Sequence, residues 1–259
     1  AVNVLSASLS SSQSAAIQNT TVGKAKKITI NSYLNVDPGQ ADSGTIVNTD
    51  YGKATATMVS GGGVSGATIG VNMTTATNDA KGYAYIKDAA IGSAGERAKI
   101  EINSYGCSNA DASLSEGSEL SLIGAGVNSI TANANGVFDA FIDTKYAIYA
   151  TSADVKTLYA VNGTAIVSDG KADVSLLSIK VNKATADTNS LSSAYIKGSG
   201  MLNTTDDVNV TSTGKATSRA YYRKPTVSLS GIKVAYNEIS AELHSEQNAY
   251  IDLASLVTS

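Results

Sequence analysis

The chain has 259 residues, of which 16% are charged, a formal net charge of −3, one histidine, one cysteine and no tryptophan. A lone Cys107 excludes an internal disulfide, and the single His244 limits any Ser-His-Asp arrangement to its own surroundings. The acidic balance, without a basic stripe, argues against a nucleic-acid partner, and no apolar stretch approaches the ~18 residues of a membrane-spanning helix, so we expect no membrane insertion.

The N-terminal part begins with a degenerate copy of a repeat, Ala15-Ala16-Ile17, followed by the alternating strand Lys27–Tyr33. After it, Asp37-Pro38-Gly39-Gln40 is a turn-forming tetrapeptide, and about fourteen extra residues around it are expected to form a loop. The alternating strand returns almost unchanged at Lys99–Tyr105 and in a third version at Asp207–Ser212. Period-two alternation of this kind predicts strands.

A longer motif, Ala-aromatic-Ile, recurs four times, and its isoleucines are 56, 54 and 55 residues apart. The copies are Ala84-Tyr85-Ile86, Ala140-Phe141-Ile142, Ala194-Tyr195-Ile196 and Ala249-Tyr250-Ile251. A short segment before each copy keeps step with it through Val71, Val127, Val181 and Val234. Self-similarity at a fixed period indicates a stack of like units.

Short alternating runs punctuated by Gly, Asn, Asp and Ser predict an all-β fold. Dividing each repeat of ~55 residues into about three turns of ~18 residues predicts a right-handed parallel β-helix, a β-solenoid of about fourteen turns and on the order of 65 Å long. We expect residues 1–259 to form one continuous segment, a fragment of a longer chain. Its approximate repeats are 1–45, 46–106, 107–160, 161–213 and 214–259.

The aromatic residues of the repeated motif are the candidate contact residues. If Ala and Ile point inward, strand alternation places Tyr85, Phe141, Tyr195 and Tyr250 on the outer surface, roughly in line and about 14 Å apart. Exposed aromatic rings suit contact with carbohydrate or protein. In the alternative interpretation, which we favour, each ring packs under a loop or against a neighbouring side chain.

Motifs that would carry chemistry are few. Residues 61–66 match the pattern G-x-G-x-x-G, but no helix follows to bind a phosphate, so a turn is expected. The Ser-x-x-Lys spacing at 168–171 also lies on an expected turn. Gly-Lys-Ala recurs at Gly52, Gly170 and Gly214 and is interpreted as a structural corner.

The local setting of His244 is the strongest candidate for a metal site. A strand would place Glu242, His244 and Glu246 on one face, within reach of one cation, although an outward polar face explains the same pattern. Asp206-Asp207 lacks the glycine-rich repeat of calcium-binding solenoids. The sequence therefore predicts no metal, no cofactor and no catalytic residue.

The C-terminal repeat resembles repeats of very large filamentous exoproteins of Gram-negative bacteria, the leukotoxin-like and filamentous-haemagglutinin-like adhesins. The resemblance rests on residues 227–235, on Asn237 and on the motif ending at Ile251, and it covers nearly the whole chain in four or five copies. Lys180 and Lys233 depart from the Gly or apolar residue usual in that family.

This resemblance implies two-partner secretion through an outer-membrane pore and a non-enzymatic, extracellular role as a structural or adhesive segment at the cell surface. The implied partners are glycans or proteins of host-cell or bacterial surfaces. Independently of the resemblance, unpaired strand edges at the ends of a solenoid predict contact with neighbouring repeats of the same or identical chains end to end.

Two other classes stay open. One is a β-helical polysaccharide-acting enzyme or a tailspike-like carbohydrate-binding protein, and the enzyme would require clustered carboxylates or a basic catalytic residue on one face, in a cleft walled by long loops. An ice-binding solenoid would require Thr-x-Thr in register on every turn, and Thr55-Ala56-Thr57 and Thr75-Ala76-Thr77 begin such a series without continuing it.

Overall fold

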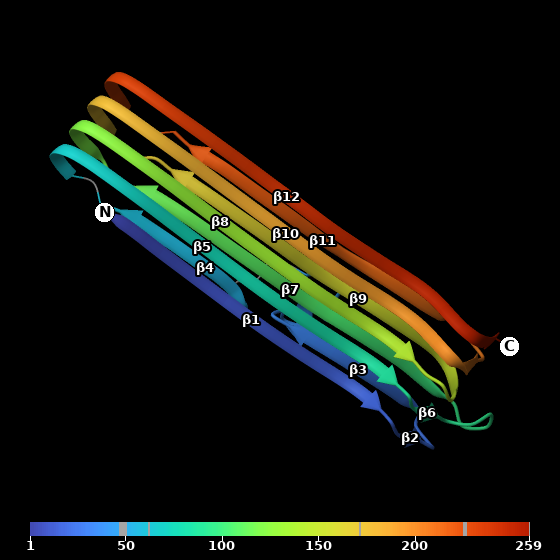
Figure 1. Cartoon of the computed structure of the whole chain (residues 1–259). Coiled ribbons are helices and arrows are strands. Elements are labelled where there is room, and N and C mark those ends of the chain that lie inside the picture. Colours follow the sequence, from blue (N-terminus) through green and yellow to red (C-terminus); the bar gives the residue numbers. More distant parts are fainter. Residues whose placement is uncertain (47–50, 62, 171, 225–226, 259) are drawn as a thin grey trace.

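The structure is a computed structural model that describes residues 1–46, 51–61, 63–170, 172–224 and 227–258. Strands make up 84% of it and helix 2%, so the predicted all-β class is confirmed. Figure 1 shows long strands that run side by side along the molecule. The elements are β1 (Val2–Gln18), β2 (Thr21–Val22), β3 (Lys27–Leu34), α1 (Pro38–Asp42), β4 (Lys53–Ser60), β5 (Gly63–Lys87), β6 (Ala90–Ile91), β7 (Ala98–Glu116), β8 (Glu119–Asp143), β9 (Ala147–Ser168), β10 (Ala172–Thr204), β11 (Val208–Arg223) and β12 (Val227–Thr258).

The strands form two facing arrays of parallel strands. The front array has the order β1, β5, β8, β10 and β12, and the back array places β3 and β4 along β7, followed by β9 and β11. Short pairings of β2, β6, the start of β9 and the end of β10 join the two arrays at one end of the long strands. The chain passes alternately along the front and the back, and the predicted parallel arrangement is confirmed (Figure 1).

The pairing register confirms the repeat and corrects its geometry. Ala84 pairs with Ala140, which pairs with Ala194, which pairs with Ala249, and the degenerate copy joins them because Ala15 pairs with Ala84. Residues one repeat apart are therefore hydrogen-bonded neighbours. The predicted division of each repeat into three turns of ~18 residues is wrong, because one repeat makes a single passage along both arrays.

The dimensions change accordingly. The 17 residues of β1 alone extend over about 55 Å, whereas the front array from β1 to β12 is only about 20 Å across. The long axis lies along the strands, so the expected rod of fourteen stacked turns and ~65 Å is also wrong. The division points at residues 106, 160 and 213 fall inside β7, β9 and β11.

Small and branched apolar side chains fill the narrow space between the arrays. Ala84 and Ile86 of β5 face Ile100 and Ile102 of β7, and all four are fully buried. A second apolar cluster, toward the other end of the strands, contains Phe138 and the alanines that surround it. Alternation thus places the Ala and Ile of the repeated motif inside, as predicted.

Hydroxyl groups lie in the interior as well. Ser104 Oγ donates to the carbonyl oxygen of Gly82 at 3.1 Å, and Ser192 Oγ donates to Thr157 Oγ1 at 2.7 Å. All of these side chains are buried, so the hydrogen bonds remove the cost of desolvating the hydroxyls.

Phe138 is the largest apolar side chain of the second cluster, and glycines make room for it. A Cβ atom at Gly106 or Gly136 would overlap its ring, and one at Gly82 would approach the ring to 3.1 Å. The ring stacks on Tyr159 with 5.9 Å between centroids. Glycines within these strands therefore serve packing, whereas the sequence suggested that they end strands.

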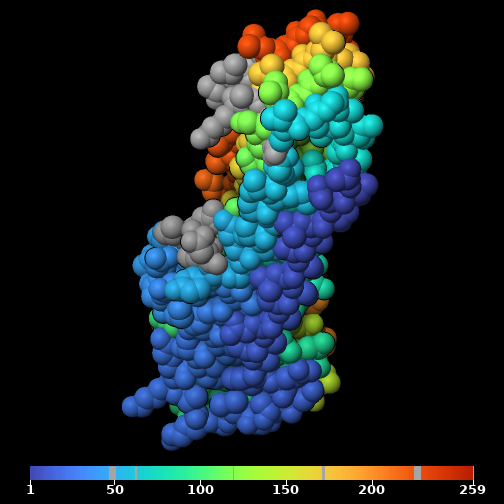
Figure 2. Space-filling model, turned by 90° about the vertical axis from the view of Figure 1, so that its left-hand side faces the viewer, coloured from blue at the N-terminus to red at the C-terminus, as the bar shows by residue number. Residues whose placement is uncertain are grey.

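The predicted insertion around Asp37-Pro38 is confirmed in position, but the tetrapeptide expected to form a turn begins the helix α1, with Asp37 as its N-cap. The insert, residues 35–46 with 51 and 52, stands where the neighbouring β7 has only two residues, because Leu34 pairs with Gly106 and Lys53 with Asn109. It covers the outer face of the back array, where Ala41 packs against Tyr105 and Leu158. Figure 2 views the molecule from the side formed by β1 and this N-terminal region (blue).

The C-terminal edge of the front array is only partly covered. Ile239 and Leu243 of β12 are each 50% exposed, although their partners Ala184 and Thr188 on β10 are buried. In the part of the chain that the structure describes, β11 is the last strand of the back array, so the inner face of β12 has no strand of its own opposite it.

We predict that Gly106→Ala destabilises the protein by about 2–3 kcal/mol, because the added methyl group overlaps the Phe138 ring and the core must shift. Gly95→Ala, where a Cβ atom meets no other atom within 4 Å, is the matched control and should be nearly neutral. Chemical denaturation measures both variants. Equal stability of the two would contradict the packing role of Gly106.

Candidate functional site: an aromatic ladder on the outer face

The four predicted contact residues form a continuous ladder on the outer face of the front array. Ring centroids are 4.8 Å apart for Tyr85 and Phe141, 4.9 Å for Phe141 and Tyr195, and 5.2 Å for Tyr195 and Tyr250, with interplanar angles of 3°, 3° and 6°. The expected separation of about 14 Å is therefore wrong, because the rings lie on adjacent strands.

Stacking determines which parts of the rings remain accessible. Tyr85, Phe141 and Tyr195 are half-buried, whereas Tyr250 on the edge strand is 42% exposed. The two middle rings have neighbours on both faces and present mainly their edges to solvent. The mutual packing agrees with the alternative interpretation, in which neighbouring side chains cover the rings. Contact with a ligand stays a prediction. The uncovered face of the Tyr250 ring is the part of the ladder most accessible to one.

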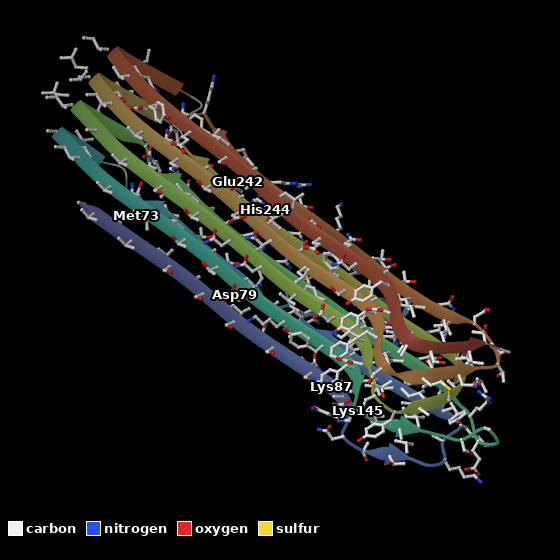
Figure 3. All side chains as sticks on the ribbon, turned by 45° about the vertical axis from the view of Figure 1, so that its right-hand side comes forward. Met73, Asp79, Lys87, Lys145, Glu242 and His244 are labelled. Atoms are coloured by element: carbon white, nitrogen blue, oxygen red, sulfur yellow. The ribbon has the colours of Figure 1, made fainter. Side chains whose placement is uncertain are left out.

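A row of alternating charges runs beside the ladder. Lys87, Asp143, Lys197 and Asp252 are successive partners across the front array. Lys197 Nζ lies 3.7 Å from Asp143 Oδ2 and 4.9 Å from the centroid of the Tyr195 ring. Figure 3 shows Lys87 at the end of β5 that carries this row. Opposite charges on adjacent strands favour the observed register.

On its other side, the ladder is flanked by Asp139, a carboxyl group in an unfavourable setting. Burial raises the pKa of Asp139 to about 6, although hydrogen bonds from the backbone and hydroxyl of Ser193 partly lower it. Its Oδ1 atom is buried and has no hydrogen-bond partner among the described residues. The pKa of Tyr195 is raised, mainly by burial and then by the charge of Asp139.

We predict that Asp139→Asn stabilises the protein at pH 7 by about 1–3 kcal/mol and has little effect below about pH 4. The folded-state pKa of about 6 lies above the ordinary value of 3.8, so the unchanged chain loses stability as the pH rises between those values. The free energies of unfolding of the variant and the unchanged chain, measured with denaturant from about pH 4 to pH 7, test this prediction. Asp252→Asn, at an exposed position of β12, is the control, and a difference that did not vary with pH would contradict the prediction.

An asparagine ladder crosses the interior of the front array. Asn3, Asn72 and Asn128 each donate from Nδ2 to Oδ1 of the next asparagine at 2.9, 2.9 and 2.7 Å, and Asn182 continues the series to Asn237 at 2.9 Å. The sequence showed these asparagines beside the periodic valines but gave no reason to assign them a role. That these asparagines occupy the same position in successive repeats is the signal that could have identified the ladder.

The same ladder corrects one alignment made from the sequence. Val181 pairs with Tyr236, and Val234 pairs with Ile179, so Val234 is not the counterpart of Val181. By contrast, the three versions of the alternating strand are aligned as predicted, since Ile102 shares its position with Ile30, Val155 and Val210.

We predict that Asn128→Ala destabilises the protein by about 2–3 kcal/mol, because it removes one hydrogen bond from each of Asn72, Asn182 and Glu116 inside the protein. Asn237→Ala, at the exposed end of the ladder, should cost less than about 1 kcal/mol. Thermal unfolding of the two variants measures the difference. Equal effects would show that the ladder contributes little to stability.

Lys180, one of the departures from the resembled family, belongs to a buried ionic cluster. It occupies the inward register position that Gly126 holds on the adjacent β8 and Gly70 on β5 beyond it, and its Nζ lies 2.8 Å from Glu116 Oε2 and 3.3 Å from Asp173 Oδ2. Burial alone would lower the pKa of Lys180, but the surrounding carboxylates raise it above its ordinary value. The cluster keeps Lys180 charged inside the protein.

The remaining sequence motifs have separate outcomes. Gly52 has a positive φ of 60° at the start of β4, as expected of a corner, but Gly214 lies within β11, so its interpretation as a corner is wrong. Gly62, part of the motif at 61–66, lies outside the described residues. So does Lys171, which belongs both to the Ser-x-x-Lys motif at 168–171 and to the Gly-Lys-Ala motif that begins at Gly170. Thr55-Ala56-Thr57 lies on β4 and Thr75-Ala76-Thr77 on β5, in different arrays, so they do not form one threonine row.

The residues around His244 are brought to one outer face as predicted. Glu242, His244 and Glu246 are all exposed on β12, and His244 Nε2 lies 3.9 Å from Glu242 Oε2 (Figure 3). No group of three or more potential metal ligands is present in the described ranges.

Among the residues that the structure covers, no helix is long and apolar enough to cross a membrane. In comparisons with known proteins, the chain matches no family model, no curated protein and no solved structure.

Proposed function

We propose that this chain is a structural and adhesive segment of a secreted bacterial filamentous surface protein. Its fold in this proposal is a β-solenoid in which one repeat of ~55 residues makes one complete turn. The observation that carries the proposal is the register, which sets chemically similar residues of successive repeats directly beside one another. Such an arrangement extends by adding repeats and presents each outward residue type as a row.

The side-chain ladders support a structural role. Five asparagines and four aromatic rings repeat the same contact from strand to strand, so each added repeat gains similar interactions. Repeats stabilised mainly by their neighbours form rigid extended surfaces. Export by a partner pore and location at the cell surface come from the sequence resemblance and belong to the proposal. So does end-to-end contact with further repeats, for which the half-covered β12 offers a site.

The polysaccharide-acting alternative has one observation in its favour. A shallow pocket on the outer surface is lined by Asp154, Asp206 and Asp207 together with Lys99. Asp154 Oδ1 accepts a hydrogen bond from Asn209 Nδ2 at 2.8 Å, which holds that carboxylate in place. Glycoside hydrolysis by two carboxyl groups requires one on each side of the scissile bond. Release of reducing ends from polysaccharides that stops on Asp207→Asn would favour this alternative.

We predict that the purified chain binds saturably to an array of surface glycans and matrix proteins, and that Tyr85→Ser with Tyr195→Ser removes the part of the binding due to the aromatic ladder. Loss of these two rings removes exposed apolar edges on both sides of Phe141. Thr75→Ser with Thr185→Ser changes the same two strands on the same face and is the control. Absence of saturable binding to any surface, by a folded protein, would contradict the adhesive role.

A further inference from the structure

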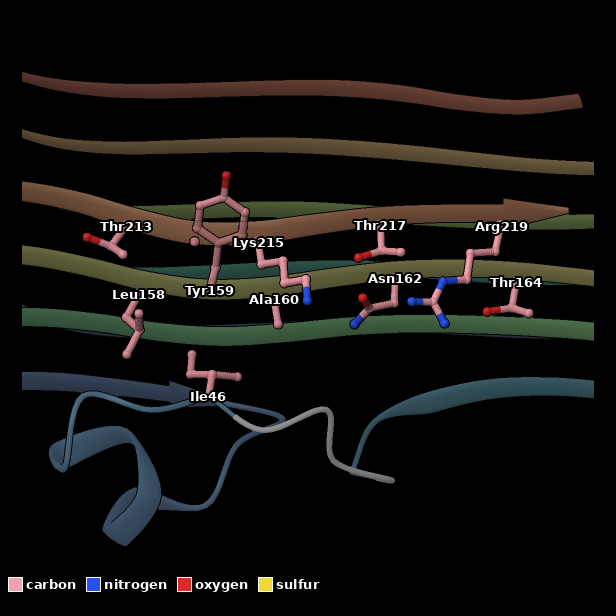
Figure 4. A pocket seen from close by; sticks show the side chains of 11 residues that line it. Ile46, Leu158, Tyr159, Ala160, Asn162, Thr164, Thr213, Lys215, Thr217 and Arg219 are labelled. Carbon is pink, nitrogen blue, oxygen red and sulfur yellow. The ribbon is translucent and has the colours of Figure 1, made fainter.

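The outer face of the back array contains a groove that is separate from the aromatic ladder. β9 and β11 form its floor, and the insert borders it at Ile46 (Figure 4). Strand alternation directs every second side chain of these strands into it. The polar side chains in the groove are Asn162, Thr164, Thr213, Lys215, Thr217 and Arg219.

Two cations dominate this groove. Lys215 and Arg219 are exposed, and Figure 4 shows their side chains extending toward one another on either side of Asn162. Thr217 lies between them on β11, and its partner on β9 is Asn162. Two cationic side chains that extend toward one another beside hydroxyl groups favour the binding of an anionic group.

The charges around the groove leave the two cations available. Arg219 pairs with Thr164 on β9, and Thr164 pairs with Asp111 on β7. The carboxylate of Asp111 already forms an ion pair with Lys53. The partner of Lys215 on β9 is Ala160, whose partner on β7 is Cys107. Among the described residues, no carboxylate lies within 4.0 Å of either cation. A local positive site thus stands on a chain whose net charge is −3.

We propose that this groove binds a sugar carboxylate of an acidic oligosaccharide, with Lys215 and Arg219 on the carboxylate and the hydroxyl group of Thr217 beside an adjoining sugar hydroxyl. The inference rests on the proposed surface role and names the class of ligand for it. Charge-assisted hydrogen bonds supply the affinity, and the threonines of the groove offer neutral donors and acceptors for further sugar hydroxyls.

The groove suits a saccharide better than a nucleic acid. Single-stranded nucleic acids bind through aromatic faces on which bases stack, and the ring of Tyr159, the aromatic residue of the groove lining, is buried to 1% exposure. The acidic chain as a whole also repels a polyanion of high charge density, whereas a single carboxylate needs only the local pair of cations.

The test measures binding of tetragalacturonate, sialyllactose and neutral maltotetraose by calorimetry at low salt. We expect the acidic sugars to bind, maltotetraose to bind at least about tenfold more weakly, and Lys215→Gln with Arg219→Gln to lower the affinity for the acidic sugars about tenfold or more. Tighter binding of tetragalacturonate would assign the carboxylate to an internal uronate, and tighter binding of sialyllactose to a terminal acidic sugar.

The matched control is Lys81→Gln with Lys87→Gln, which removes the same charge from exposed positions of the front array and should leave the affinity unchanged. Thermal unfolding confirms that all variants fold. Equal loss in the control, no binding of acidic sugars, or tighter binding of a short DNA duplex that depends on Lys215 would each overturn the inference. None of these outcomes affects the aromatic-ladder test, because the two surfaces lie on opposite arrays.

Discussion

Parallel pairing in register is the constraint on which the rest of this structure depends. Because each residue lies beside its counterpart one repeat away, any side chain that recurs is brought into contact with its own kind. Alanine and isoleucine then form continuous buried columns, asparagines satisfy one another, and flat rings stack. The same constraint fixes what cannot recur, since a large inner side chain such as Phe138 requires glycine around it, at Gly82 on the paired β5, at Gly136 on its own strand and at Gly106 on β7 opposite.

The sequence predicted the class and the period because both depend on local pattern. The Ala-aromatic-Ile motif aligned the repeats correctly, even for the degenerate Ala15-Ala16-Ile17, but the interpretation placed the copies three turns apart, whereas they pair directly. The number of turns per repeat was missed because Gly82 and Gly136 look like strand ends, whereas they lie within strands and accommodate a ring. The misaligned Val234 has another cause. A shift of two residues keeps every side chain on the same face, so alternation cannot distinguish Val234 from Tyr236.

The surface sites required the three-dimensional arrangement to different degrees. The aromatic residues could be chosen from the sequence, but their stacking depends on the strands of successive repeats being adjacent in the sheet. Lys215 and Arg219 were hidden by the net charge of −3, which sums over all faces of the molecule. Lys180 was noticed as unusual, but only the space left by Gly70 and Gly126 shows why a lysine can enter the interior.

The alternating row of Lys87, Asp143, Lys197 and Asp252 has a consequence for how such a chain evolves. A recombination event that deletes one unit would set Lys87 against Lys197, and two like charges on adjacent strands repel. Deleting two adjoining units restores an opposite pair, Lys87 against Asp252. Gains and losses of units in even numbers therefore keep the charges alternating, whereas odd numbers set like charges side by side.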